Sequence, residues 1–513
     1  MREQPDPDVL VIGAGPTGLL LAIVLSRLGV RVQIVDRKAG PTRESRAVVL
    51  QARTLEIYDQ LGLAERMTAA SAAARLVAPG YGRRRFGVLP IGELGSGITP
   101  FPRLTVLEQS KTESILGEYL AELSVPVQWN TEVEPAHDVA DSGSVTVRSP
   151  EGSRVIRARY VVGADGSNSL VRRSLGISFD GSTNTHSFFV CDTDNTRGLT
   201  ANAVNVRLGD AEFLLSFPLG GDDSGGHHRI IGLLPSGGSE IDEAATRATV
   251  DEVFGVSWSE SHWFSTYRVQ HRVASTFRRG RVFFAGDAAH VHSPVGAQGM
   301  NTGLQDAHNL AIKIAEVIRG TAPDEYLDRY EAERRPVAVR LIATTDRVFG
   351  LATSSTRRAR LVRRRLAPLL APLVIRVIPR VRGASRFFGY LSQTRIHYWM
   401  DAEEKQRSRG RRDPVVGRRL PWVAGANGGN YAVLRAFEWQ VHGYGGADVA
   451  PIGAALGIAS HRFPSTGTTG LASSLVYLVR PDGFVAAAAP HAGAARVFAA
   501  AMPTPRRAQS RES

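Results

Sequence analysis

A stretch near the N-terminus, from Asp8 to Arg37, constrains the fold more than any other part of the sequence. Its apolar residues Val9–Ile12 predict a short buried strand, which runs into the glycine-rich turn Gly13-Ala-Gly15-Pro-Thr-Gly18. An apolar helix is expected from about Pro16 to Leu28, and a second strand from Val30 to Val35. These elements follow one another in the order of a Rossmann-type βαβ unit.

The three glycines and the acid that follows them indicate what this unit binds. Gly13 permits a tight turn, Gly15 lets the backbone approach a pyrophosphate, and Gly18 lets the helix pack closely on the strand. The helix N-terminus offers free N–H groups to phosphate oxygens. Asp36 ends the second strand, where a carboxylate accepts hydrogen bonds from an adenosine ribose. We therefore predict a bound dinucleotide rather than a bare structural turn.

Length and cysteine usage bound the class of protein. A chain of 513 residues is long enough for two or three domains. The one cysteine, Cys191, excludes an intramolecular disulfide, a cysteine metal cluster and a C-x-x-C redox motif, and it fits a reducing cytoplasm. The sequence shows no signal-peptide pattern, and its apolar segments at 9–25 and 366–378 are interrupted. We expect a cytoplasmic protein without stable membrane insertion.

The chain is strongly basic, with a net charge of +13. Nucleic-acid binding requires a basic patch interleaved with stacking aromatic side chains, and aromatic residues make up only 7% of the sequence. We expect no nucleic-acid partner, and we expect the charge to attract an anionic small molecule instead.

The middle of the chain alternates β-like segments with glycine-rich turns. Residues 176–275 predict an antiparallel sheet inserted between two parts of the nucleotide domain. This insert leaves and rejoins the nucleotide domain beside the predicted cofactor, so Phe217, Pro218 and Leu219 are candidates for the substrate pocket. The alternative is that these three residues merely end a core strand.

Three further segments can be interpreted as structural or as functional. His290 and His292 have no obvious third ligand, so we expect structural roles rather than a metal site. The arginine-rich segment 355–386 is either a membrane-surface helix or a surface helix pair broken by prolines, and the prolines favour the second. Residues 415–505 predict a small α/β module with strands near 432–434 and 474–480.

Three motifs in order resemble a known family. They are Gly13-x-Gly15-x-x-Gly18, Gly163-Ala-Asp165-Gly166-Ser, and Arg281-Val-Phe-Phe-Ala-Gly286-Asp287-Ala-Ala-His290 followed by Pro294-x-Gly296-x-Gln298-Gly299-x-Asn301. Together they resemble the single-component FAD-dependent aromatic hydroxylases, or class A flavoprotein monooxygenases. The branch that looks most similar is the phenol hydroxylase-like enzymes that tailor aromatic polyketides and inactivate rifamycin-type antibiotics. Ala297 departs from the pattern, because many relatives carry glycine there.

The resemblance implies an α/β fold in which a glutathione reductase-like, Rossmann-like FAD-binding domain carries an inserted antiparallel β-sheet substrate domain and a C-terminal thioredoxin-like domain. That last domain lacks paired cysteines, so a redox role for it is excluded. The expected boundaries are 1–175 and 276–400 for the FAD-binding domain with a helical segment, 176–275 for the substrate domain, 411–505 for the C-terminal domain, and 506–513 for a disordered tail.

The resemblance also assigns cofactor roles. Asp36 and Arg37 hold the adenosine end, Arg46 and Gln109 reach the flavin, and Asp287 accepts a ribityl hydroxyl. The Asp165 motif is linked in the family to both FAD and NADPH, which binds without a domain of its own. The full cofactor-binding set is Gly13, Gly15, Thr17, Gly18, Asp36, Arg37, Arg46, Gln109, Val133, Asp165, Gly286, Asp287, Pro294, Gly299, Met300 and Asn301.

The implied activity is FAD- and NADPH-dependent hydroxylation of a phenolic or polycyclic aromatic substrate by O2, through a flavin hydroperoxide, in a monomer or homodimer. No catalytic acid or base is identified from the sequence. Baeyer–Villiger oxygen insertion on the same scaffold and a non-catalytic flavin-binding regulator remain alternatives. A flavin-dependent halogenase is disfavoured, because the sequence lacks Trp-x-Trp-x-Ile-Pro.

Overall fold

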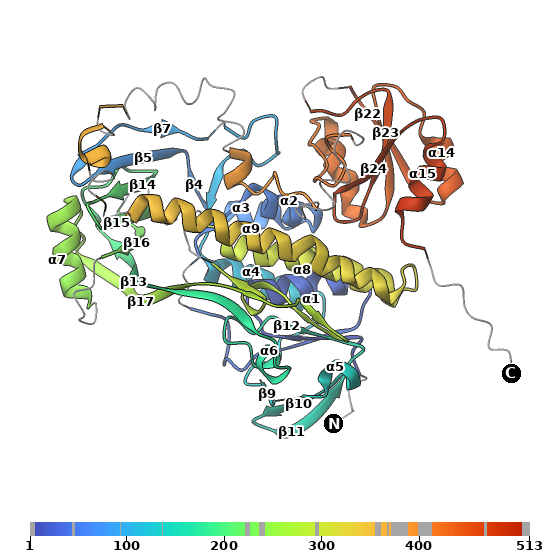
Figure 1. Ribbon diagram of the computed structural model, residues 1–513, viewed down its shortest axis with the longest axis horizontal. Helices are drawn as coiled ribbons and strands as arrows, with labels where there is room; N and C mark the ends of the chain where they lie inside the picture. The colour runs from blue at the N-terminus through green and yellow to red at the C-terminus, as the bar shows by residue number, and fades with distance from the viewer. Residues whose placement is uncertain are drawn as a thin grey trace.

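The computed structural model describes residues 6–43, 47–92, 94–135, 137–220, 226–234, 242–292, 297–353, 356, 361–366, 369–370, 388–398, 413–465 and 469–504. Figure 1 shows three parts: a central α/β part, a β-sheet at one side with the helix α7 (Glu243–Phe254) on its outer face, and a C-terminal module at the other side. Two predicted site residues, Arg46 and Pro294, lie outside the described residues, as do most of the arginine-rich segment and the tail.

The central part is built on a five-stranded sheet in the order β18-β19-β12-β1-β2. Four of its strands, β19, β12, β1 and β2, are parallel, while the short edge strand β18 runs antiparallel to β19. Parallel strands are covered by helices on both faces, which explains why β1 and β12 are apolar and buried throughout. The predicted βαβ unit is confirmed as β1, α1 and β2. The bounds are β1 (Val9–Ile12), α1 (Pro16–Arg27), β2 (Val32–Val35), β12 (Tyr160–Gly163), β18 (Arg278–Arg279) and β19 (Val282–Phe284).

The register of this sheet brings the three sequence motifs together. Ile12 pairs with Gly163, and Gly163 pairs with Phe284. The turns that follow these residues therefore leave the sheet side by side at the carboxyl ends of adjacent parallel strands. Open α/β sheets bind ligands at this edge.

The second part is a nine-stranded sheet in the order β20-β17-β13-β16-β15-β14-β5-β6, with β7 pairing with β5. Its strands pair antiparallel, except that β14 and β5 are parallel. Residues 76–90 thus join the sheet that was predicted for 176–275. The bounds are β5 (Leu76–Tyr81), β6 (Arg84–Arg85), β7 (Leu89–Pro90), β13 (Phe179–Asp194), β14 (Ala203–Leu208), β15 (Phe213–Pro218), β16 (His228–Leu233), β17 (Glu260–Ala274) and β20 (His290–Val291).

Alternation along the strands gives this sheet two different apolar faces. On β13, Phe188 and Val190 belong to one buried cluster, while Phe189 and Cys191 belong to another. The second cluster includes Phe254 of α7, so that helix covers one face of the sheet. Because side chains of a strand point alternately to its two faces, the first cluster lies on the opposite face.

The C-terminal module has a four-stranded sheet in the order β22-β21-β23-β24. The strand predicted near 474–480 is confirmed as β23, but the one predicted near 432–434 is wrong, since these residues lie in the 3₁₀ helix η5. Two adjacent glycines with positive φ, Gly428 and Gly429, fall in that segment and disfavour an extended strand. The bounds are η5 (Ala426–Ala436), β21 (Gln440–Tyr444), α14 (Ala450–Leu456), β22 (Ala459–Phe463), β23 (Leu475–Val479), β24 (Val485–Pro490) and α15 (Ala494–Ala501).

Buried ion pairs fasten this module to the central part. Arg480, just after β23, donates to both carboxylate oxygens of Glu333 at 2.6 and 3.0 Å. Lys313 donates to the same carboxylate at 2.8 Å. Glu333 lies on α9 (Asp328–Thr353) and Lys313 on α8 (Gly299–Ile318), so one carboxylate ties two helices to the module. Removing a partner of such a buried pair leaves an uncompensated charge.

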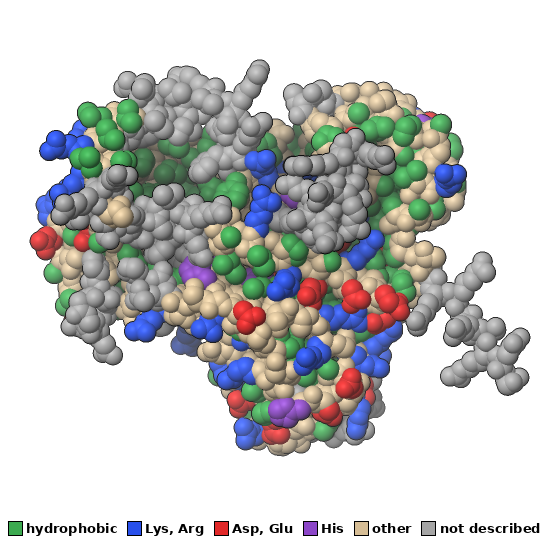
Figure 2. Space-filling model, in the orientation of Figure 1, with side chains coloured by type: hydrophobic (Ala, Val, Ile, Leu, Met, Phe, Trp, Pro, Cys, Tyr) green, Lys and Arg blue, Asp and Glu red, His purple; other side chains and the backbone are tan. Residues whose placement is uncertain are grey.

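No helix within the described ranges is long and apolar enough to cross a membrane. Over the lobe that carries β9–β11, Figure 2 shows basic and acidic side chains mixed on the visible face. The remaining bounds are β3 (Val49–Leu50), α2 (Ala52–Gln60), α3 (Ala64–Ala69), β4 (Ala72–Ala74), β8 (Leu104–Val106), α4 (Gln109–Glu122), β9 (Glu132–Val133), α5 (Val139–Ser142), β10 (Ser144–Ser149), β11 (Gly152–Arg157), α6 (Leu170–Ser174), η1 (Gly286–Ala288), η2 (Asp324–Leu327) and η3 (Val362–Leu366).

Candidate active site

A cavity of about 610 Å³ lies between the motif turns of the central part and one face of the nine-stranded sheet. We call its two sides the nucleotide half and the sheet half. The nucleotide half is lined by Gly15, Pro16, Thr17, Gln109, Gly166, Ser167, Asp287, Gly299 and Met300. The sheet half is lined by Phe188, Phe213, Leu215, Phe217, Ile231, Trp263, Ser265, Tyr267 and Val269. A phosphate-binding turn and an aromatic wall therefore face the same space.

The glycines of the fingerprint turn differ in what surrounds them. Gly13 has a φ of +107°, and a Cβ there would lie 2.3 Å from the carbonyl oxygen of Ala164. A Cβ on Gly18 would lie 1.9 Å from the carbonyl oxygen of Gly13. By contrast, a Cβ on Gly15 would meet nothing within 4 Å. Two glycines are thus required by packing, while the third leaves room for a ligand close to the backbone.

Thr17 sets the spacing between the two helices that begin at the cavity. A Cβ on Gly286 would lie 2.6 Å from the Thr17 hydroxyl oxygen, and one on Gly303 would lie 2.5 Å from it. Thr17 lies in the first turn of α1, and Gly303 lies in the first turns of α8. The absence of side chains at both glycines lets α1, α8 and the Gly286 turn meet, so both helix N-termini reach the cavity.

Asp36 organises the fingerprint turn from the end of β2. Its carboxylate accepts hydrogen bonds from the backbone N–H groups of Ala14 at 2.7 Å and Lys38 at 2.8 Å. The residue is 8% exposed. Its neighbour Arg37 is exposed and is not among the residues that line the cavity. Asp36 thus fixes the glycine turn, in addition to any hydrogen bond that it accepts from a ribose hydroxyl.

Asp165, in the second motif, has a buried carboxylate that is only half satisfied. One oxygen, Oδ2, accepts from the backbone N–H of Leu170 at 2.8 Å. The other, Oδ1, is buried without a hydrogen-bond partner among the described residues. Burial raises the pKa of Asp165 above its ordinary value. A buried acceptor without a hydrogen-bond partner destabilises the protein. Asp165 is not among the residues that line the cavity, although its neighbours Ala164 and Gly166 are.

Asp287 is exposed and lines the nucleotide half from η1, the short helix that follows β19. The turn that carries it is held from below by Asp306 of α8, which accepts from the backbone N–H of Gly286 at 3.2 Å. Asp306 also contacts His290 Nε2 at 2.6 Å and Arg334 Nε at 2.7 Å, all in the buried core. Burial alone raises the pKa of Asp306, but His290 and Arg334 outweigh it and hold the pKa below the ordinary value.

Asp306 and Arg334 were missed by the sequence analysis. The sequence signal is weak, because Asp306 lies among other polar residues of α8, such as Gln305 and Asn309, and only its burial requires a charged partner. Its partner is 28 residues away on α9, so that signal does not identify Arg334.

Asn301 lies at the site, but its side chain is engaged elsewhere. Its Oδ1 accepts from the backbone N–H of Gln51 and from the Thr54 hydroxyl, each at 2.8 Å. Its Nδ2 donates to the carbonyl oxygens of Val49 at 2.9 Å and Ala297 at 3.0 Å. Asn301 therefore fixes the start of α8 against the β3–α2 connection. Gly299 and Met300, which precede it, reach the cavity lining.

The remaining predicted cofactor residues are placed differently. Gln109 lines the cavity and donates to the buried Glu113 at 2.8 Å, and Glu113 accepts from the backbone N–H of Thr42 at 3.0 Å. Val133 lies in β9, buried in the hydrophobic core of the central part and outside the cavity lining.

Of the three predicted substrate residues, Phe217 lines the sheet half, whereas Pro218 and Leu219 are not among the lining residues. Leu219 packs in the same buried cluster as Phe217. Two further lining residues, Trp263 and Tyr267 of β17, were not predicted from the sequence; they alternate with Ser265 along the strand. Period-two alternation is the signal that identifies them, once the face of the sheet that meets the cofactor is known.

The nucleotide half fits a dinucleotide with a flavin end. It offers an open approach at Gly15, two helix N-termini and an exposed carboxylate at Asp287. The cavity continues past the glycine turn into an aromatic space, as a redox cofactor that meets an apolar substrate requires.

Comparisons with known proteins agree with this geometry. Residues 6–345 match the family model described as FAD binding domain. The chain is 36% identical to 6-methylpretetramide 4-monooxygenase from Streptomyces rimosus over 75% of this chain and 68% of the relative. It is 34% identical to rifampicin monooxygenase from Streptomyces venezuelae over 66% of this chain and 70% of the relative.

A solved structure extends the similarity to nearly the whole chain. Anhydrotetracycline hydroxylase from Streptomyces rimosus superposes with a TM-score of 0.75 and 29% identity, covering 96% of this chain and 98% of the other. The predicted α/β fold class and family resemblance are confirmed, as is FAD as the cofactor. The chain therefore belongs to the FAD binding domain family and is an enzyme of the flavin-dependent aromatic monooxygenases.

Proposed function

We propose that this enzyme hydroxylates a polycyclic phenolic substrate of the aromatic polyketide or related antibiotic class, with O2 as oxidant and NADPH as reductant. The observation that carries the proposal is the shared cavity, in which Gly15 and Asp287 face Phe217, Trp263 and an apolar sheet face. Relatives named for tetracycline precursors and for rifampicin support a substrate with several fused rings.

The size and lining of the sheet half favour this substrate class. Its apolar positions come from four adjacent strands, among them Phe188 of β13, Phe217 of β15, Ile231 of β16 and Tyr267 of β17. Aromatic rings stack on or against aromatic rings at centroid separations of about 4.5–7 Å. Phe188 and Tyr267 already stack at 5.7 Å and present one continuous wall to a planar substrate.

Polar groups at the junction of the two halves would orient the substrate. Ser265, Arg268 and Gln270 of β17 line the cavity beside His292. A guanidinium stabilises a phenolate, which is the activated form of a phenol in aromatic hydroxylation. Arg268 is therefore our candidate for positioning the phenolic oxygen.

FAD supplies the redox and oxygen-activating chemistry when bound, and transfer through a flavin hydroperoxide is part of this proposal. The chain's own residues bind and orient. Asp36 and Asp165 hold the two turns that flank the nucleotide, and Asp287 offers an acceptor to the ribityl chain. The sheet half excludes water from the reacting atoms, which protects a reactive oxygen species from loss.

A substrate screen tests the proposal directly. FAD-loaded enzyme is supplied with NADPH and a panel of polycyclic phenols, each paired with its O-methyl ether. We expect the phenols to accelerate NADPH oxidation and to gain one oxygen on the ring, while the ethers do neither because they form no phenolate. Failure of every phenol to stimulate NADPH oxidation or to yield product would contradict the proposal.

Product structure separates the two oxygen-insertion reactions. Hydroxylation and Baeyer–Villiger insertion both add one oxygen, so mass alone does not distinguish them. A new phenolic carbon in the product spectrum supports the proposal, and a lactone carbonyl supports Baeyer–Villiger insertion instead.

A further inference from the structure

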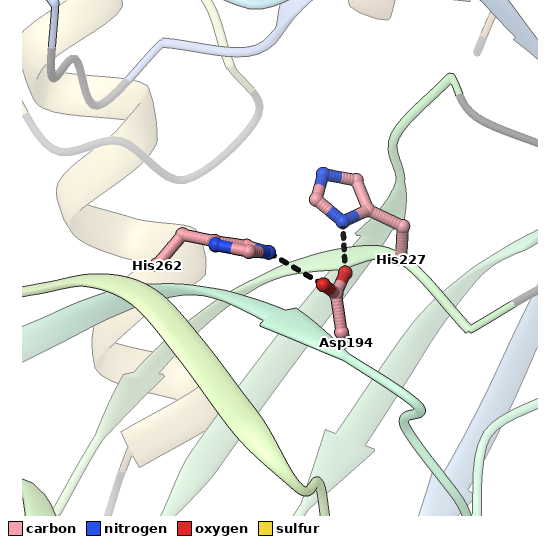
Figure 3. Close-up of side chains that lie close together, drawn as sticks. All are labelled: Asp194, His227 and His262. Atoms are coloured by element: carbon pink, nitrogen blue, oxygen red, sulfur yellow. Dashed lines mark hydrogen bonds and ion pairs between the residues drawn. The ribbon is translucent and has the colours of Figure 1, made fainter.

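Three side chains from three separate segments converge at the outer end of the nine-stranded sheet (Figure 3). Asp194 is the last residue of β13, His227 precedes β16, and His262 lies near the start of β17. His262 Nε2 lies 2.5 Å from Asp194 Oδ2, and His227 Nδ1 contacts Asp194 Oδ1. The two imidazole rings are 5.7 Å apart and tilted by 49°.

A β-bulge directs one of the histidines into this cluster. Asp192 pairs with Trp263 and Thr193 pairs with Ser261, so His262 is the extra residue on β17. Bulges re-aim a side chain relative to the regular alternation of a strand. Trp263 points into the cavity, while the bulged His262 meets the carboxylate at the end of the neighbouring strand.

The chain beyond Asp194 is also shaped around the cluster. Asn195 adopts a φ of +52°, in the left-handed region. Its side-chain Nδ2 donates to the Ser259 hydroxyl oxygen at 3.0 Å, just before β17. The ends of β13 and β17 are thus held together on both sides of the histidine–carboxylate contact, which fixes the positions of two potential ligands.

The donor set and its exposure suit a metal ion. Imidazole nitrogen and carboxylate oxygen are standard ligands of Zn²⁺, and three protein ligands leave a fourth position for water. One nitrogen from each histidine and an oxygen of Asp194 lie within 4.8 Å of one another. Ligand atoms about 2.1 Å from one ion are at most about 4.2 Å apart, so only a small side-chain movement is needed. The side chains are 32–54% exposed, so an ion and its water have access.

We propose that Asp194, His227 and His262 form a binding site for a divalent transition-metal ion such as Zn²⁺. The ion would take the place of the protons that now bridge the three side chains, and it would cross-link β13, the approach to β16 and β17. The site adjoins the wall of the cavity through the neighbouring Asp192, Arg229 and Trp263, among which Arg229 pairs with Asp192 at 2.6 Å and lies 5.6 Å from the Trp263 ring. Its role is to stabilise the outer end of the sheet.

Zn²⁺ binding to untagged, FAD-loaded enzyme tests this site. After chelator treatment, the protein is dialysed against Zn²⁺ and the bound metal is counted by elemental analysis. We expect one equivalent in the wild type, and at least a tenfold weaker affinity in His262→Ala and in Asp194→Asn. The matched control is His137→Ala, which removes an exposed histidine that contacts the Ser174 carbonyl oxygen and is not part of the cluster, so this variant should bind Zn²⁺ as the wild type does.

Thermal unfolding supplies a second measurement that does not depend on catalysis. Zn²⁺ should raise the melting temperature of the wild type and of His137→Ala, and it should leave that of His262→Ala unchanged, because a ligand of the native state stabilises it. His262 is more than half exposed, so its removal does not disturb the core. Absence of Zn²⁺ binding in the wild type, or equal binding in His262→Ala, would overturn the proposal.

Discussion

The two halves of the cavity differ in what forms them. In the nucleotide half, closely packed glycines let the motif turns and helix N-termini meet beside the cavity, and added Cβ atoms at Gly18, Gly286 and Gly303 would come within 1.9–2.6 Å of neighbouring oxygens. In the sheet half, side chains such as Phe217 and Ile231 form the surface, and their backbone lies in a regular antiparallel ladder. The nucleotide half thus depends on positions that lack a side chain, and the sheet half depends on the side chains that its strands present.

This difference explains how one scaffold serves many substrates. The glycines and buried carboxylates of the nucleotide half change little without loss of the fold, because the carboxylates also fix the turns that follow β1, β12 and β19. An apolar sheet face tolerates substitutions that keep its volume. We expect the nucleotide half to respond to mutation through cofactor binding and stability, and the sheet half through substrate kinetics.

The largest effect is expected from Asp306→Ala. This change leaves Arg334 and His290 buried without their carboxylate and releases the Gly286 turn. Loss of one partner of a buried charge pair costs about 3–5 kcal/mol. Chemical denaturation should show that loss together with weakened FAD retention. If the free energy of unfolding of Asp306→Ala equalled that of the wild type, the nucleotide half would not depend on the Asp306 carboxylate, and the contrast with the sheet half would fail.

Gly18→Ala and Gly15→Ala form the next pair. The new methyl at position 18 would overlap a backbone oxygen, so we expect destabilisation of roughly 1–3 kcal/mol or more, as for overpacked cores. The methyl at position 15 meets no protein atom, so stability without FAD should match the wild type while FAD affinity falls. Denaturation of the flavin-free proteins and FAD titration measure the two effects. Equal FAD affinity in Gly15→Ala and the wild type would refute the role assigned to Gly15.

Asp287→Ala and Asp36→Ala sharpen the distinction between binding and support. Each removes a charged acceptor, and a hydrogen bond to a charged group contributes about 1.5–3 kcal/mol, or roughly a 10- to 150-fold loss of FAD affinity. Asp36 is buried and accepts two backbone hydrogen bonds, whereas Asp287 is exposed, so Asp36→Ala should destabilise the flavin-free protein more than Asp287→Ala does. If Asp287→Ala retained FAD as the wild type does, its assignment to the ribityl chain would be wrong.

The acid stability of the fold should depend on Asp306. Its pKa is held below the ordinary 3.8, so its stabilising contribution is complete above that value and is lost as the pH falls through the folded-state pKa. Asp306→Asn, which cannot ionise, should therefore lose less stability than the wild type between pH 5 and pH 2, relative to its own value at neutral pH. Parallel acid profiles of the two proteins would contradict the assignment.

The smallest effect is expected in the sheet half, from Phe217→Leu compared with Phe189→Leu. Both phenylalanines are buried in the same sheet, but Phe217 lines the cavity and Phe189 packs on the face that α7 covers. Each change should cost about 1 kcal/mol of stability. Only Phe217→Leu should also change the KM or coupling of an aromatic substrate, by about 2- to 12-fold for a lost ring contact, with FAD content unchanged. Identical kinetics in the two variants would favour the core interpretation of Phe217.

The sequence by itself determined the nucleotide half to a large extent. A turn that needs Gly13 and Gly18 leaves few backbone solutions, so a short motif predicts strand, turn, helix and cofactor together. The same local logic located Asp36 and Asp287 at the carboxyl ends of their strands. Local steric constraints and hydrogen bonds involve only a few consecutive residues, so the sequence motif alone is enough to predict this half of the cavity.

Only the tertiary structure decided the rest. Period-two alternation gives β13 and β17 two apolar faces, and nothing local says which one meets the cavity and which one meets α7. Likewise, the pairing of Asp306 with Arg334 and the meeting of Asp194, His227 and His262 join residues that lie far apart in the chain. Such contacts depend on register and packing between distant segments. The sequence therefore contains each of these residues but no local pattern that shows which of them come into contact.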